Sequence, residues 1–164
     1  MNVDVRRIKT VVLSHIHGDH TGGLPAILSE NSEVTVYLPA SFPESFKREI
    51  QAYGCRVVEV SGPMRVCRGV GVTGELGLTL KEQALIVNTK KGLIVITGCA
   101  HPGVVNMASA ASKLTGEKIY LVIGGFHLAG SSKAEISKVI GGLKKLGVAC
   151  VAPCHCTGSL ATQM

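Results

Sequence analysis

Ser14-His15-Ile16-His17-Gly18-Asp19-His20 is the stretch on which the fold assignment depends. It directly follows residues 8–13, an apolar segment with the composition of a buried strand. Side chains two apart on an extended chain project to the same side, so His15 and His17 are expected to converge while Asp19 and His20 begin a second group. Nitrogen and carboxylate donors suit Zn²⁺, Mn²⁺ or Fe²⁺ better than Mg²⁺ or Ca²⁺. The stretch therefore predicts a loop that binds two transition-metal ions.

The placement of all six histidines supports this interpretation. Each one comes just after a predicted strand, in a loop flanked by glycine or cysteine: His15, His17, His20, His101, His127 and His155. Histidines of a packed core would scatter over helix and strand faces, and a purification tag would cluster at a terminus. The pattern therefore indicates one functional site assembled from several loops.

The chain alternates predicted strands and helices, which indicates an α/β fold in one domain, residues 1–164. Strands are predicted at residues 8–13, 34–38, 56–60, 84–88, 93–97, 119–123 and 148–151. Helices are predicted at residues 22–30, 103–114 and after two apparent capping boxes, Ser41-Phe42-Pro43-Glu44 and Ser132-Lys133-Ala134-Glu135. The glycine-rich residues 62–80 cannot be assigned from the pattern.

Composition narrows the class of protein. Hydrophobic residues make up 46 % and charged residues 17 %, which argues against disorder. The Lys and Arg residues behind the net charge of +6 are spread thinly along the chain and are not interleaved with aromatic residues. An anionic small molecule is therefore expected as partner rather than nucleic acid. No apolar run is long enough to span a membrane, and residues 1–7 lack the apolar stretch of a signal peptide. We therefore expect a cytoplasmic protein whose six cysteines are reduced thiols.

Three further motifs make a family resemblance specific. These are Thr97-Gly98-Cys99-Ala100-His101-Pro102-Gly103, Gly124-Gly125-Phe126-His127-Leu128 and Pro153-Cys154-His155-Cys156-Thr157-Gly158. With the first loop, whose His-x-His-x-Asp-His pattern is that of the metallo-β-lactamase superfamily, they resemble the subfamily of 7,8-dihydropterin-6-methyl-4-(β-D-ribofuranosyl)aminobenzene 5′-phosphate synthase. Bacterial relatives in that subfamily are known simply as metal-dependent hydrolases. The resemblance runs over residues 11–158.

The resemblance implies metal ligands in three of the four motifs. His15, His17 and His101 would hold one divalent ion, and Asp19, His20 and His155 the other, with zinc expected first and manganese or iron as alternatives. The superfamily usually has a bridging Asp between the motifs that correspond to His101 and His155, but this chain has no Asp after Asp19. His127 follows the strand where that Asp would stand, so we interpret it as a catalytic residue near the metal or substrate, with a purely orienting role as the alternative.

Residues near the ligands have open interpretations. Cys154 and Cys156 flank His155. They are interpreted either as thiols close to the metal or as residues that only contribute to packing. The turns at residues 22–23, 102–103 and 157–158 offer helix N-termini to phosphate oxygens, or simply make tight turns.

The resemblance also implies a fold, a four-layer αββα sandwich, that is incomplete at its N-terminus here. In relatives, strands precede the metal loop, so residues 1–164 would be the C-terminal portion of the full domain. A fragment, a partner chain or second copy that covers the missing sheet, and a minimal natural variant are the three explanations. The apolar strand at residues 11–13, with nothing evident to pack one side, favours the first.

The function expected from these residues is that of a metal-dependent hydrolase or transferase, with Asp19 and His127 as catalytic residues. Two metals would lower the pKa of a bridging water and polarise a phosphoryl or acyl group. In the subfamily's named reaction they would instead bind a pyrophosphate leaving group that an arylamine displaces. A catalytically inactive metal-binding fragment is the non-enzymatic alternative.

Overall fold

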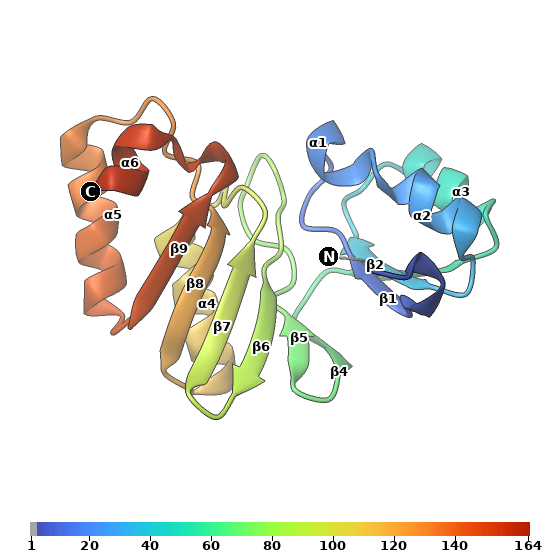
Figure 1. Ribbon diagram of the computed structural model, residues 1–164, viewed down its shortest axis with the longest axis horizontal. Coiled ribbons are helices and arrows are strands. Elements are labelled where there is room, and N and C mark those ends of the chain that lie inside the picture. The colour runs from blue at the N-terminus through green and yellow to red at the C-terminus, as the bar shows by residue number, and fades with distance from the viewer. Residues whose placement is uncertain (1–2) are drawn as a thin grey trace. The chain divides into compact units, whose positions relative to one another are not determined.

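The computed structural model describes residues 3–164, which form two compact units with the boundary between Ser61 and Gly62. Both units combine strands with helices (Figure 1), which confirms the α/β class. That residues 1–164 form one domain stays a prediction. The segment used to predict the absence of a signal peptide begins with residues 1 and 2, which lie outside the described residues.

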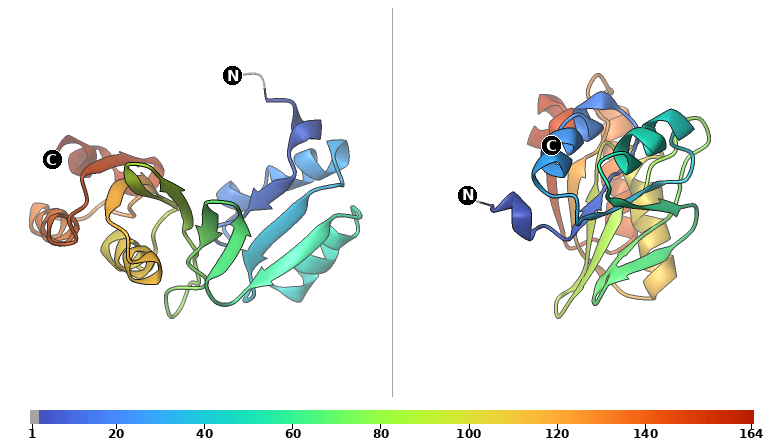
Figure 2. Two further views of the ribbon diagram at one scale, coloured as in Figure 1. Left: turned by 90° about the horizontal axis from the view of Figure 1, so that it is seen from below. Right: turned by 90° about the vertical axis from the view of Figure 1, so that its right-hand side faces the viewer.

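The first unit is a small parallel sheet with helices, and its strands follow the chain in the order β1-β2-β3 (Figure 2). Its elements are η1 Val5–Arg7, β1 Thr10–Val12, α1 Gly18–Thr21, α2 Leu24–Glu30, β2 Thr35–Pro39, α3 Glu44–Gln51 and β3 Arg56–Val60. The core is built from alternate residues of β2, Val36 and Leu38, with Leu24 and Leu28 of α2 and Ile50 of α3. Strand β1 lies at the sheet edge, and the chain leaves it directly into the histidine loop.

The prediction of a capping box at Ser41 is wrong. Helix α3 begins at Glu44 with Pro43 as its N-cap, and no side chain caps it. Phe42 precedes a proline, which disfavours helical backbone at that position. Its N–H instead bonds to Pro39 O at 3.0 Å, in a turn that brings its ring into the core.

The second unit contains a six-stranded mixed sheet in the order β4-β5-β6-β7-β8-β9. Its elements are β4 Met64–Cys67, β5 Val70–Val72, β6 Leu85–Thr89, β7 Gly92–Thr97, α4 Val104–Thr115, β8 Ile119–Gly125, α5 Lys133–Lys145, β9 Cys150–Cys154, η2 His155–Thr157 and α6 Ser159–Gln163. Strands β6 and β7, both predicted, pair as an antiparallel hairpin, whereas β4 and β5 lie in the stretch that the pattern left unassigned.

Helices α4 and α5 complete the core of the second unit. Helix α4, which was predicted at residues 103–114, packs against β7, β8 and α5 (Figure 1) and buries Val104, Met107, Ala108 and Ala111. Leu114, in the last turn of the helix, is 45 % exposed. No helix in residues 3–164 is both long and apolar enough to cross a bilayer.

The capping box that begins α5 is confirmed. Ser132 Oγ accepts the Glu135 N–H at 3.3 Å, and the Glu135 carboxylate accepts the Ser132 N–H at 2.8 Å. This reciprocal pair satisfies two backbone donors that the helix cannot bond internally.

Parallel pairing of β7, β8 and β9 decides where the site residues of the second unit lie. Because all three strands run the same way, their carboxyl ends meet at one edge of the sheet. His101 follows β7, His127 follows β8 and His155 follows β9. In α/β sheets this edge is the usual place for a binding site.

Candidate metal centre

The His15/His17 pair in the first unit has the geometry of two ligands to one ion. Ser14 Oγ lies 3.0 Å from His15 Nδ1, which directs the other ring nitrogen, Nε2, to within 3.2 Å of His17 Nδ1. Two nitrogens bound to one tetrahedral zinc ion lie about 3.3 Å apart. The observed spacing therefore fits a shared metal ion.

Asp19 and His20 join the same cluster through a short helix. The chain does not stay extended after His17, because α1 begins at Gly18 and His17 is its N-cap. His20 Nε2 lies 3.3 Å from Asp19 Oδ2, and the His20 ring centroid lies 4.2 Å from that of His15. All four predicted ligands of the first unit are thus brought together, by a helical turn rather than by strand alternation.

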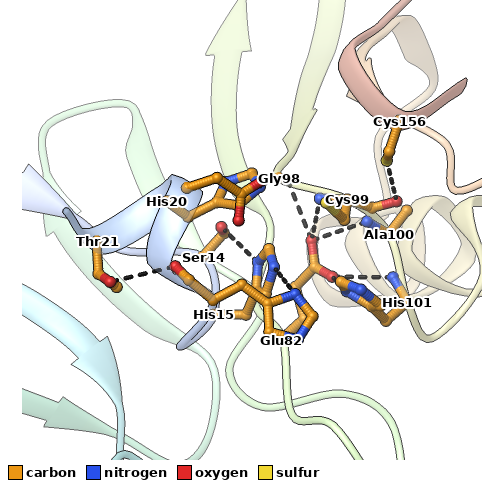
Figure 3. Close-up of polar contacts among 12 residues, drawn as sticks. Ser14, His15, His20, Thr21, Glu82, Gly98, Cys99, Ala100, His101 and Cys156 are labelled. Atoms are coloured by element: carbon orange, nitrogen blue, oxygen red, sulfur yellow. Dashed lines mark hydrogen bonds and ion pairs between the residues drawn. The ribbon is translucent and has the colours of Figure 1, made fainter. Parts of the chain in front are cut away.

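Glu82, which the sequence analysis missed, organises the loop that carries His101. This carboxylate is fully buried, and its Oε1 accepts the backbone N–H groups of Gly98, Cys99 and Ala100 at 2.9–3.1 Å (Figure 3). Its Oε2 lies 2.9 Å from both the backbone nitrogen and Nδ1 of His101. A carboxylate on one nitrogen of a histidine fixes the ring and its tautomer, so that Nε2 is the nitrogen suited to a metal.

Backbone strain is concentrated beside the candidate ligands. Within residues 3–164 the non-glycine residues with left-handed φ are Ala100 at 61°, His127 at 51° and His155 at 51°. Such a conformation costs about 1–3 kcal/mol and persists where the surrounding structure imposes it, often at functional sites. Each of these residues is a candidate site residue or, for Ala100, the neighbour of one.

The loops of His127 and His155 are tied together by Thr157. Its buried hydroxyl accepts the Phe126 N–H at 3.1 Å and donates to Cys154 O at 2.7 Å. This use of the hydroxyl favours the tight-turn interpretation of residues 157–158 over a phosphate contact. The exposed His127 ring lies 4.4 Å from the His101 ring, between centroids.

Glycine is required where β8 approaches the His101 loop. A Cβ built on Gly125 would lie 2.4 Å from Gly98 O and 2.7 Å from Cys156 Sγ. The Gly125 N–H donates to Gly98 O at 3.0 Å, so the two backbones are in direct contact. The close approach explains why this motif has glycine before Phe126 and His127.

Cys99 is a second residue of the site that the sequence analysis missed, and its sulfur is a candidate metal ligand. Its sulfur is buried and lies within 4.8 Å of a ring nitrogen of His101 and within 4.8 Å of one of His155. None of the six cysteines forms a disulfide in the structure; Cys154 is exposed, and Cys156 Sγ donates to Cys99 O at 3.5 Å. The position of Cys99 two residues before His101 was the signal available in the sequence.

The donors gathered in each unit suit a transition metal. Imidazole nitrogen, carboxylate oxygen and thiol sulfur are ligands of zinc, and imidazole and carboxylate also bind manganese and iron. The orientation of His15 by Ser14 and of His101 by Glu82 adds the outer contacts that metal-ligating histidines usually have. The residues present therefore fit divalent metal ions.

Comparison with known proteins identifies the family. The model of the metallo-beta-lactamase superfamily matches residues 1–105, and this chain belongs to that superfamily. It is 34 % identical to the 7,8-dihydropterin-6-methyl-4-(beta-D-ribofuranosyl)-aminobenzene-5′-phosphate synthase of Methanocaldococcus jannaschii, over 100 % of this chain and 71 % of the synthase. The predicted family and its subfamily resemblance are thereby confirmed.

Solved structures confirm the fold. The structure of Tm1679, described as a metal-dependent hydrolase of the beta-lactamase superfamily, matches with a TM-score of 0.79 and 31 % identity, over 93 % of this chain and 70 % of that one. The metallo-beta-lactamase fold protein YhfI from Bacillus subtilis matches with a TM-score of 0.64 and 13 % identity, over 98 % and 70 % of the two chains.

Proposed function

We propose that this protein is a metal-dependent enzyme that acts on a phosphorylated or otherwise anionic small molecule. His15, His17 and His101 are the proposed ligands of one divalent ion, and Asp19, His20 and His155 those of a second, with zinc as the expected metal. The observation that carries the proposal is the paired geometry of His15 and His17, matched in the second unit by a carboxylate-oriented His101. Bound metals would acidify a water molecule and polarise a phosphoryl group.

The chain's own residues have distinct roles in this proposal. Ser14 holds the His15 ring in one orientation, and the Glu82 carboxylate holds the His101 ring in one orientation and one tautomer. Asp19 is proposed both to bind the second ion and to accept a proton at a carboxylate oxygen. His127, exposed beside the His101 ring, is proposed to contact the substrate.

A cavity beside His101 supports a small-molecule substrate. It has a volume of about 590 Å³ and is lined by residues 76–80 with His101, Pro102 and Asn106. Small-molecule sites typically have about 300–1,000 Å³, with mostly apolar walls and a few polar groups. Three leucines, an asparagine amide and a candidate metal ligand match that description.

Hydrolysis is the first candidate reaction, and condensation is the second. The condensation is favoured by the 34 % identity, over the whole chain, to a synthase whose name joins a dihydropterin methyl group to a ribofuranosylaminobenzene 5′-phosphate. Both reactions act on a phosphorylated substrate, but at different atoms. In hydrolysis, water would attack the phosphorus and the P–O bond to the leaving alcohol would break. In the condensation, the arylamine nitrogen would attack the pterin methylene carbon, the C–O bond would break and diphosphate would leave.

Metal analysis followed by two assays tests the proposal. The metal-loaded protein is offered bis(4-nitrophenyl) phosphate, and separately a dihydropterin-methyl diphosphate with an aminobenzene riboside 5′-phosphate. Turnover of either that is lost in Asp19→Asn and kept in Glu135→Gln, the same chemical change at a helix cap, supports an enzyme. Bound metal with no turnover favours a metal-binding module instead, and protein without metal overturns the site.

Three expectations from the sequence stay predictions alongside this proposal: the cytoplasmic location, the absence of a nucleic-acid partner, and a homo-oligomer or partner chain that covers the sheet.

A further inference from the structure

Cys99 is the donor that the six-ligand proposal does not use. It lies in the loop after β7, between Gly98 and Ala100, and its side chain is 4 % exposed. Its backbone N–H donates a hydrogen bond to Glu82 Oε1 at 2.9 Å (Figure 3). The same carboxylate that orients His101 therefore also fixes the position of Cys99.

We propose that the Cys99 sulfur is a further metal ligand, shared by the ion that His101 binds and the ion that His155 binds. This inference rests on the proposed dinuclear site and deepens it. Cys99 Sγ lies within 4.8 Å of a ring nitrogen of each histidine. Nitrogen and sulfur on one tetrahedral zinc ion lie about 3.5 Å apart, so each pair needs to close by little more than about 1 Å.

The charge balance of the site provides an independent reason. The six proposed ligands contain one acidic residue, Asp19, for two dications, and the chain has no later aspartate. Glu82 is committed to four backbone N–H groups and a histidine ring, and Glu135 to the cap of α5. A thiol that coordinates a metal is deprotonated, so Cys99 supplies a second negative charge between the ions.

The neighbouring thiols differ from Cys99 in ways that make them matched controls. Cys156 Sγ points to Cys99 O at 3.5 Å, and Cys154 is exposed beside His155. Of the three cysteines near this edge of the sheet, Cys99 is therefore the one proposed to bind metal through its sulfur. Variants of Cys99, Cys154 and Cys156 test which of the three sulfurs is the ligand.

Cobalt loading of the reduced, metal-free full-length protein tests the proposal. Wild-type protein is expected to develop a near-ultraviolet sulfur-to-cobalt charge-transfer band that grows over two equivalents, because a shared sulfur bonds to each ion. The band should disappear in Cys99→Ser and persist in Cys154→Ser and Cys156→Ser. Cys99→Asp should bind two cobalt ions without the band, since a carboxylate restores the shared negative charge.

The results separate this inference from the proposed function. Two bound cobalt ions without a band in wild type, or a band unchanged by Cys99→Ser, overturn the role of Cys99 alone. No bound metal overturns the dinuclear site and Cys99 with it. If Cys99→Ser fails to fold, as judged by circular dichroism, the wild-type band and Cys99→Asp decide the question. A second cobalt ion held no more weakly in a folded Cys99→Ser than in Cys156→Ser also contradicts the proposal, because loss of a direct ligand should cost at least the ~10–100-fold typical of outer partners.

Discussion

Replacing Glu82 by glutamine keeps the shape of the side chain but removes its charge and one acceptor. Oε1 accepts three backbone N–H groups, and Oε2 serves the backbone nitrogen and Nδ1 of His101. With an amide NH₂ in the second position, the His101 N–H loses its acceptor. The NH₂ group also favours a proton on Nε2 of His101, which is the nitrogen expected to bind metal.

The cost of Glu82→Gln follows from these contacts. A hydrogen bond to a charged group contributes about 1.5–3 kcal/mol, and the three bonds that remain weaken when the charge is removed. We therefore expect the metal-free protein to lose about 3–5 kcal/mol of unfolding free energy, a large part of the ~5–15 kcal/mol of an ordinary domain. Zinc affinity should fall by the ~10–100-fold typical of an outer partner of a ligand.

Urea denaturation of the chelated protein and competition with a chromophoric chelator measure the two effects. Glu135→Gln is the matched control, because its carboxylate caps an exposed helix end, and its loss should cost far less. If Glu82→Gln matched Glu135→Gln in both measurements, Glu82 would have no role in orienting His101.

Three other predictions test particular contacts. Gly141→Ala in α5 should stabilise the protein by about 1 kcal/mol, because alanine favours helix and nothing lies within 4 Å of the added Cβ. Gly142→Ala should not give this stabilisation, because its Cβ would lie 2.9 Å from the Val105 side chain. The urea midpoints of the two variants test the difference. Lys47 is buried and bonds to Glu44 at 2.7 Å and to Glu59 at 2.6 Å. These carboxylates raise the pKa of Lys47 above 10.5, and the Lys47 ammonium lowers the pKa of Glu44 below 4.5. The stabilisation by these ion pairs is thus lost as pH falls below 4.5 or rises above 10.5. The difference in urea midpoint between wild type and Lys47→Met should therefore shrink at both extremes of pH, and a constant difference would contradict the pairing. His127→Ala should retain both metal ions but lower turnover, and equal loss of metal and activity would instead make it an outer partner of a ligand.

Much of the fold was predictable because each signal was local. Apolar runs gave the strands β2, β3, β6, β7 and β8, and Ser132 with Glu135 gave the start of α5. The first capping box failed because the same spacing at Ser41 contains Pro43, whose effect on the preceding residue outweighs the cap. Strands β4 and β5 were missed because they are only four and three residues long and lie in a glycine-rich stretch, and the pairing of β5 with β6 is not a local property.

The histidines of the site were found because they follow strands, and strands that run parallel bring such loops to one edge. Glu82 could not be found in the same way. It lies 19 residues before His101, outside any motif, and its role depends on a loop that turns four N–H groups toward one carboxylate. Cys99 was inside a recognised motif, but its closeness to both His101 and His155 depends on the pairing of β7, β8 and β9.

Metal content of the purified protein is the measurement that tests the central claim most directly. Elemental analysis of wild-type protein, prepared without chelator, should find up to two divalent transition-metal ions per chain, with zinc first. His17→Ala should lose one ion and His155→Ala the other, while Glu135→Gln should retain both. A wild-type protein with no metal above background, or ligand variants that hold as much metal as wild type, would contradict the assignment of these histidines.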